Sequence, residues 1–134
     1  MSSRASGPFD VKLTPEAGDT PAEGAALGRL AIAKTFHGGL QATSTGTMIS
    51  AMTSVKGSAA YSAIERVSGT LDGRAGTFAL QHTGVMDRGT PSLRVTVVPD
   101  SGTGDLTGLA GTMEIQVDAG AHTYVFDYTL GERS

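Results

Sequence analysis

The sequence lacks cysteine altogether and has few aromatic residues. Its 134 residues include no Cys, three Tyr and four Phe. Without cysteine the chain can form no disulfide, no thiolate nucleophile and no thiolate metal site. Stabilisation therefore has to come from packing, and any chemistry has to come from carboxylates, imidazoles, amines and hydroxyls.

Long apolar runs and concentrated positive charge are also missing. No apolar stretch reaches the length needed to span a bilayer, and the first ten residues lack the apolar core of a signal peptide. The formal net charge is -3, with acidic and basic residues interspersed. Because phosphate binding needs a basic patch, this pattern argues against a nucleic-acid surface. We expect a cytoplasmic protein without nucleic-acid or membrane partners.

The abundant features are glycines and short alternating segments. There are 19 glycines, and no amphipathic run is long enough for a secure helix. Alternation punctuated by turn residues predicts an all-β domain spanning 1-134. Eight strands are expected, enough for a closed antiparallel β-barrel whose interior holds side chains or one small ligand. The Pro-, Gly- and acid-rich segment 15-26 is interpreted as a surface loop, with a lid as the alternative.

A hairpin at the centre of the chain organises this prediction. Asp72-Gly73 is a strong turn signal between two strand-like runs. A two-residue loop places Glu65 opposite Leu80, and a four-residue loop places it opposite His82. Either even length puts the same side chains on one face, whereas an odd length would reverse it. The larger, more apolar face is assigned to the interior and carries Tyr61, Ala63, Glu65, Val67, Phe78, Leu80 and His82.

Glu65 and His82 form the best candidate for a catalytic pair. Both face the expected interior, and a buried carboxylate needs a partner. A carboxylate that orients an imidazole makes a general acid or base, and burial could instead raise the pKa of Glu65 until it donates a proton. The structural alternatives are a hydrogen-bonded pair without chemistry, or pairing of Glu65 with Arg66 or Arg94.

The final hairpin, through Ala119-Gly120, supplies a second inward polar set. Its strongly apolar face includes His122, Tyr124, Phe126 and Tyr128. Tyrosine hydroxyls can orient a carbonyl or carboxylate, although they usually pack with the hydroxyl satisfied. The substrate-binding prediction therefore comprises Tyr61, Phe78, Leu80, His122, Tyr124, Phe126 and Tyr128, whereas Gln81 faces outward.

Other chemistries find little support. His37, His82 and His122 do not converge in the predicted strands, so no metal site is expected. The glycines between 102 and 108 lack the GxGxxG spacing and a following helix, and GxSxG is absent. No cofactor is expected.

An internal echo and three longer segments point to a family. GTLDGRAGTF (69-78) aligns with GDLTGLAGTM (104-113), which suggests one corner shape used twice. KTFHGGLQATSTG (34-46), ERVSGTLDGRAGTFALQHTG (65-84) and SGTGDLTGLAGTM (101-113) resemble a bacterial family catalogued as a domain of unknown function. That family resembles allene oxide cyclase, and more distantly dirigent and lipocalin-like barrels. The resemblance implies an eight-stranded barrel with a cavity and is compatible with a homo-oligomer, but it transfers no catalytic residues.

Three functions follow as hypotheses. The first is a cofactor-independent cyclase or isomerase that confines a small, largely apolar metabolite, with Glu65 and His82 moving protons. The second is a non-catalytic carrier or sensor of such a molecule. The third is a structural barrel with a filled interior.

Overall fold

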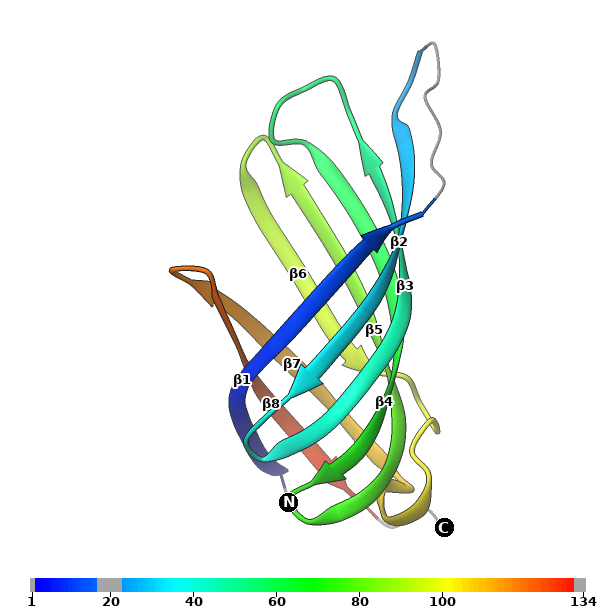
Figure 1. Ribbon diagram of the computed structural model, residues 1–134, viewed down its shortest axis with the longest axis vertical. Helices are drawn as coiled ribbons and strands as arrows, with labels where there is room; N and C mark the ends of the chain where they lie inside the picture. Colours follow the sequence, from blue (N-terminus) through cyan, green and yellow to red (C-terminus); the bar gives the residue numbers. More distant parts are fainter. Residues whose placement is uncertain (1, 17–22, 132–134) are drawn as a thin grey trace.

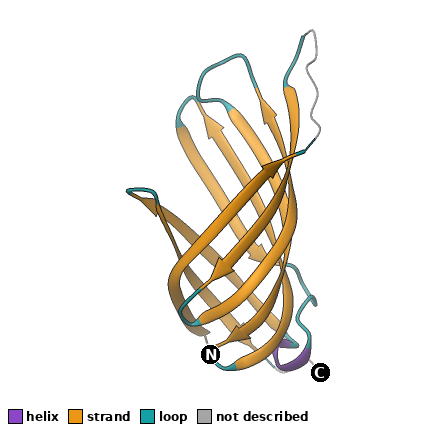
Figure 2. Ribbon diagram, viewed as in Figure 1, coloured by secondary structure: helices purple, strands orange, loops and turns teal. Residues whose placement is uncertain are grey.

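The computed structural model describes residues 2-16 and 23-131 and consists almost entirely of antiparallel strands (Figures 1 and 2). The strands close into one barrel in chain order, and the only helical segment described is a single 3₁₀ turn, η1 (Gly104–Leu106). The strands are β1 (Ser2–Pro15), β2 (Ala26–Phe36), β3 (Leu40–Met52), β4 (Ala59–Leu71), β5 (Arg74–Asp87), β6 (Thr90–Val97), β7 (Leu109–Asp118) and β8 (Ala121–Leu130). The prediction of an all-β, eight-stranded antiparallel barrel is confirmed.

Two-residue turns fix which side chains face inward. Asp72 and Gly73 both have positive φ, 48° and 85°, as a type I′ turn requires. The register follows, with Leu71 opposite Arg74 and Glu65 opposite Leu80. The two-residue alternative is therefore the correct one. Ala119-Gly120 forms an equivalent turn, which places Val117 opposite His122 as the sequence predicts.

The internal echo adopts two different shapes. Its first copy is the hairpin turn between β4 and β5, whereas its second copy contains η1 and leads into β7. The position of Asp72 is taken by Thr107, which has φ -58°. A β-branched residue strongly disfavours positive φ, so the second copy cannot repeat the tight turn. Only the glycines at 73 and 108, both with positive φ, and the strands that follow them are alike.

The barrel has a packed end and an open end. The start of β1, the end of β8 and the turns after β2 and β4 lie at the lower end in Figure 1, where η1 also packs. The main hydrophobic cluster fills this half, with Phe36, Phe78, Phe126 and Leu106 almost completely buried. At the upper end the inward-facing Leu13, Leu93 and Val117 are exposed. The interior is therefore sealed at one end and accessible at the other.

The two strands beside the open end separate. β6 and β7 share only two register pairs, Val95 with Met113 and Thr96 with Thr112. Beyond them the β7–β8 hairpin leans away from β6, as Figure 1 shows. This separation widens the mouth of the barrel.

The predicted loop 15-26 is described only in part. Part of the predicted loop 15-26, and the lid alternative with it, lies outside the described residues; β1 ends at Pro15 and β2 begins at Ala26. The described part of the chain contains no helix of sufficient length and apolarity to cross a membrane.

Candidate functional site

Three charged or ionisable side chains meet inside the barrel, between its packed and open halves. One carboxylate oxygen of Glu65, Oε2, accepts hydrogen bonds from Lys34 Nζ at 2.8 Å and from His82 Nε2 at 2.5 Å. All three residues are buried, with 8%, 1% and 3% exposure for Lys34, Glu65 and His82. This set is called the buried triad below.

Strand alternation and small neighbours bring the triad together. Glu65 on β4 and His82 on β5 are diagonal neighbours, because Glu65 pairs with Leu80 and Ala63 with His82. Lys34 lies on β2, so it must reach Glu65 across β3. Gly46 of β3 stands opposite Glu65 and lacks the side chain that would intervene.

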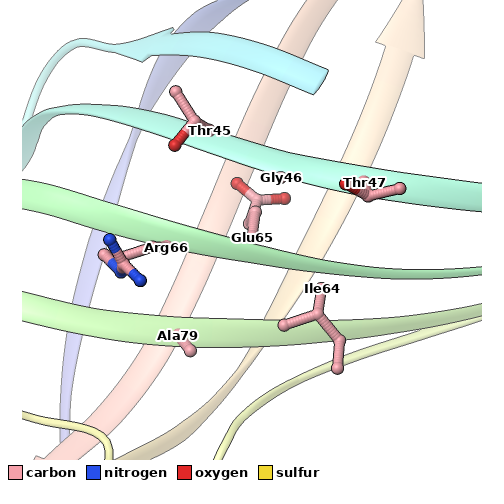
Figure 3. Close-up of a pocket in the computed structure, with 7 residues that line it drawn as sticks. All are labelled: Thr45, Gly46, Thr47, Ile64, Glu65, Arg66 and Ala79. Atoms are coloured by element: carbon pink, nitrogen blue, oxygen red, sulfur yellow. The ribbon is translucent and has the colours of Figure 1, made fainter. Parts of the chain in front are cut away.

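The absence of a side chain at Gly46 is required by close packing. A Cβ there would lie 2.6 Å from Glu65 Cα and 2.8 Å from its Cβ, and would also collide with the Ile64 carbonyl. Figure 3 shows Glu65 lying against β3 at Gly46. The residues of β3 are small, and for that reason neither of its faces is clearly apolar in the sequence. At Gly46 the small size leaves the space that Glu65 occupies.

Glu65 is an ionised carboxylate in this setting. Burial alone would raise its pKa, but the hydrogen bond from His82 and the charge of Lys34 outweigh burial and lower the pKa to about 2. The alternative in which a raised pKa makes Glu65 a proton donor is therefore wrong. Its predicted structural partners, Arg66 and Arg94, are exposed residues, and the partner is Lys34.

The charge on Glu65 also fixes the histidine tautomer. An ionised carboxylate can only accept, so His82 Nε2 must carry the hydrogen. Among residues 2-16 and 23-131, none makes a hydrogen bond to Nδ1 of the same ring.

A largely apolar cavity of about 250 Å³ lies directly above the triad, toward the open end. Lys34 and His82 are part of its wall, whereas Glu65 is not. The full lining comprises Phe9, Val11, Leu13, Ile32, Lys34, Met48, Tyr61, Ala63, His82, Leu93, Ile115, Val117 and His122. The cavity is slightly below the usual volume range for drug-sized ligands, so it suits a smaller molecule.

The predicted site residues divide between this cavity and the packed half. The cavity is lined by Tyr61, His82 and His122. The Tyr61 ring packs against Gly84, where a side chain would collide with it. Burial, and secondarily the charge of Glu65, raises the Tyr61 pKa, so this phenol stays protonated. The remaining predicted ligand-binding residues lie in the hydrophobic cluster: Phe78, Leu80, Tyr124, Phe126 and Tyr128.

The two tyrosines in the packed half have structural partners. Tyr124 Oη donates to the His37 carbonyl at 2.6 Å and accepts from the Leu40 amide at 2.9 Å. Tyr128 donates to the Asp72 carboxylate. These bonds tie β8 to the turns at the closed end, and neither tyrosine lines the cavity.

Lys34 is the residue that sequence reasoning missed. It alternates with the apolar Ile32 and Phe36 on one face of β2, which was the available signal. A lysine on such a face is usually read as a solvated residue at the end of a strand. Here its ammonium also lies 5.4 Å from the Phe9 ring centroid and 5.8 Å from that of Phe36, where cation–π attraction offsets part of its desolvation.

A second hollow lies on the outside of the barrel. It occupies about 490 Å³ over β3, β4 and β5, with Thr45, Thr47, Ile64 and Arg66 around it (Figure 3). Its lining also includes Gly46, Glu65 and Ala79, whereas Lys34 and His82 are not among its lining residues. It is an open depression of the sheet surface, separate from the interior cavity.

The fold and the buried triad define the class of protein as a small closed antiparallel barrel with an interior polar cluster. Residues 5-128 match the family described as "Protein of unknown function (DUF3224)", and the chain belongs to this family. The predicted membership of an uncharacterised family is thereby confirmed.

A solved structure of the same family is similar to this chain along its length. The crystal structure, at 1.84 Å resolution, of a DUF3224-family protein of unknown function from Shewanella oneidensis MR-1 is 52% identical to this chain. The match covers 98% of this chain and 100% of the other, with a TM-score of 0.92. No curated protein matches the chain. The likeness to allene oxide cyclase stays a prediction with which the eight-stranded barrel is compatible.

Proposed function

We propose that this protein binds a small, largely apolar molecule in the open half of the barrel. One observation carries the proposal: an apolar cavity lies beneath the mouth of the barrel, and Lys34 and His82 are among the residues that line it. Small-molecule sites are typically apolar concavities with a few convergent polar groups. The third hypothesis, a filled barrel, fits the closed half only.

Buried hydrogen-bond donors that lack acceptors favour a ligand-binding role for the triad over a purely structural one. Lys34 Nζ has three hydrogens and donates one to Glu65, with no second acceptor in the described part of the chain. Leaving donors of a buried ammonium unused is costly. A ligand acceptor at the cavity floor would satisfy them.

Binding should be detectable by methyl NMR of the full chain titrated with cyclohexanone, cyclohexylmethanol and cyclohexanecarboxylate. At least one of these compounds should shift the methyls of Leu93, Ile115 and Val117, which line the cavity, and leave those of Leu71 in the closed half in place. Ile115→Phe should abolish the shifts by filling the cavity. Ile64→Phe, on the exposed outer face, is the matched control and should bind normally.

The cyclase or isomerase hypothesis is the second candidate, and the tautomer of His82 favours it. With Nε2 bonded to an ionised Glu65, Nδ1 of His82 has no hydrogen-bond partner among the described residues, and His82 lines the apolar cavity. Nδ1 could remove a proton from the carbon beside a carbonyl, the electrons passing to the carbonyl oxygen near Lys34, and return it to another carbon. In this scheme Glu65 is a positioning residue.

Proton exchange tests this candidate. Cyclohexanone incubated with the protein in D₂O should exchange its α-hydrogens at least tenfold faster than with His82→Gln, whose amide can still donate to Glu65. Equal exchange by the two proteins, with cyclohexanone binding unchanged in NMR titrations, would eliminate the enzymatic role and leave the binding role intact.

A further inference from the structure

The charge pattern around the cavity identifies the class of molecule that fits it. Among the described residues that line the cavity, the ionisable ones are Lys34, Tyr61, His82 and His122, and none is Asp or Glu. In the described part of the chain, the carboxylate that contacts Lys34 and His82 is Glu65, which binds both through the same oxygen and does not line the cavity. A ligand therefore meets two imidazoles, an ammonium and a phenol, with no acid in the wall.

The charge balance of the buried triad sets a second condition. With His82 neutral, Lys34 and Glu65 cancel, and the triad carries no net charge. An anion that enters this desolvated space needs one additional positive charge, because an uncompensated buried charge is strongly unfavourable. His82 can supply that charge at Nδ1 while Nε2 stays bonded to Glu65.

Resting on the proposed binding function, we infer that the ligand is a compact apolar carboxylic acid, bound as its anion by Lys34 Nζ and His82 Nδ1, and that its binding takes up one proton onto His82. Lys34 donates a hydrogen not used by Glu65. The apolar body of the acid lies toward Leu93, Ile115 and Val117. The cavity volume of about 250 Å³ limits that body to less than the size of a typical drug.

The other groups around His82 do not provide the same compensation. The ionisable groups that face the shared space are Glu65 and Tyr61 of β4, Lys34 of β2 and His122 of β8. Beside it β6 contributes the apolar Val95 and Leu93, since Arg94 is exposed and points away. His122 lines the same cavity and packs against Phe9, 5.3 Å between centroids, without a carboxylate partner in the described residues. Of the two described imidazoles in the cavity wall, only His82 is hydrogen bonded to a carboxylate.

The test compares two probes of matched shape, cyclohexanecarboxylate and cyclohexylmethanol, by calorimetric titration of the full chain. The acid should bind at least tenfold more tightly than the alcohol at pH 6. Histidine changes charge between pH 5 and 8, so the acid's affinity should fall with rising pH by up to about tenfold per unit. Titrations in phosphate and in Tris, which differ in ionisation enthalpy, should reveal close to one proton taken up near pH 8 and none with the alcohol.

Variants separate the two histidines and the lysine. His82→Gln keeps a donor to Glu65 and should remove the pH dependence, whereas His122→Gln should keep it. Lys34→Gln should lose the preference for the acid, and circular dichroism checks that each variant is folded. Loss of pH dependence in His122→Gln alone would overturn the assignment to His82.

The probes also distinguish the two levels of the proposal. Equal, pH-independent binding of acid and alcohol would overturn the carboxylate inference and leave the apolar binding function standing. Failure of both probes and of cyclohexanone to bind, with no difference between the wild type and Ile115→Phe, would overturn both. Preference for the alcohol would likewise reject the anionic ligand.

Discussion

Replacing Glu65 by glutamine is expected to lower the free energy of unfolding by about 3 kcal/mol at pH 7 and by little at pH 2. The pKa of Glu65 is lowered from its ordinary value of 4.5 to about 2 in the folded protein, and each pKa unit corresponds to about 1.4 kcal/mol. Thermal unfolding at pH 7 should show a fall of about 10 °C in Tm for a chain of this length.

The direction of the pH effect follows from the lowered pKa. A carboxyl group that holds its proton less tightly when folded stabilises the fold fully above its unfolded pKa. That contribution is largely lost as the pH falls from about 4.5 toward 2, where about half of the wild-type carboxyl is protonated in the folded state. Denaturation by urea at a series of pH values should show the wild type and Glu65→Gln converging on acidification.

The control for this prediction is an exposed ion pair. Arg4 and Asp127 lie 2.7 Å apart with 70% and 42% of their side chains exposed. Surface pairs of this kind contribute little, so Asp127→Asn should unfold like the wild type at pH 7. A gap between the wild type and Glu65→Gln that stays constant from pH 6 to pH 2 would contradict an ionised Glu65.

Phe126→Ala is expected to cost about 3–5 kcal/mol, the range for removing a large core side chain. Phe126 is completely buried, stacks on Phe78 with centroids 5.8 Å apart and contacts Tyr128 at 5.4 Å. The cavity left by the substitution lies in the packed half, where neighbours on all sides hold their positions. Urea unfolding followed by circular dichroism measures the loss.

Val117→Ala provides the matched comparison. Val117 belongs to the same β7–β8 hairpin and also points inward, but 63% of it is exposed at the barrel mouth. Its truncation should change stability by less than about 0.5 kcal/mol. Similar losses for the two variants would show that the open half is packed as densely as the closed half, and would remove the cavity on which the proposed function rests.

The fold was predictable because local rules agree along the chain. Asp72-Gly73 and Ala119-Gly120 specify two-residue turns, and each turn then determines the inward face of a whole hairpin. This parity placed Glu65 and His82 on one face of the hairpin, and the larger apolar surface of that face assigned it to the interior. Thr107 is the exception. The match between 69-78 and 104-113 suggested a second tight turn, but threonine disfavours the positive φ that such a turn needs at this position.

The site was harder to predict because the alternation of apolar and polar residues shows which face a side chain is on, but not its level along the barrel axis. Alternation places His122, Tyr124 and Tyr128 on one face equally well, yet His122 lines the cavity while both tyrosines hydrogen bond at the closed end. The shear of the barrel decides which residues share a level. It also brings Lys34 to Glu65 across Gly46, a contact between strands that are not neighbours.

The seam between β1 and β8 has a consequence for how the protein is made. Seven of the eight pairings join consecutive strands, but this one joins Ser2 to Thr129 and Phe9 to His122, segments from opposite ends of the sequence. On the ribosome the ring cannot close until β8 has emerged, so until then the nascent sheet has one unpaired outer edge on β1 and another on the strand made most recently. Such edges recruit other strands, and the aggregation hazard of this molecule is therefore concentrated in the interval before its last strand is released.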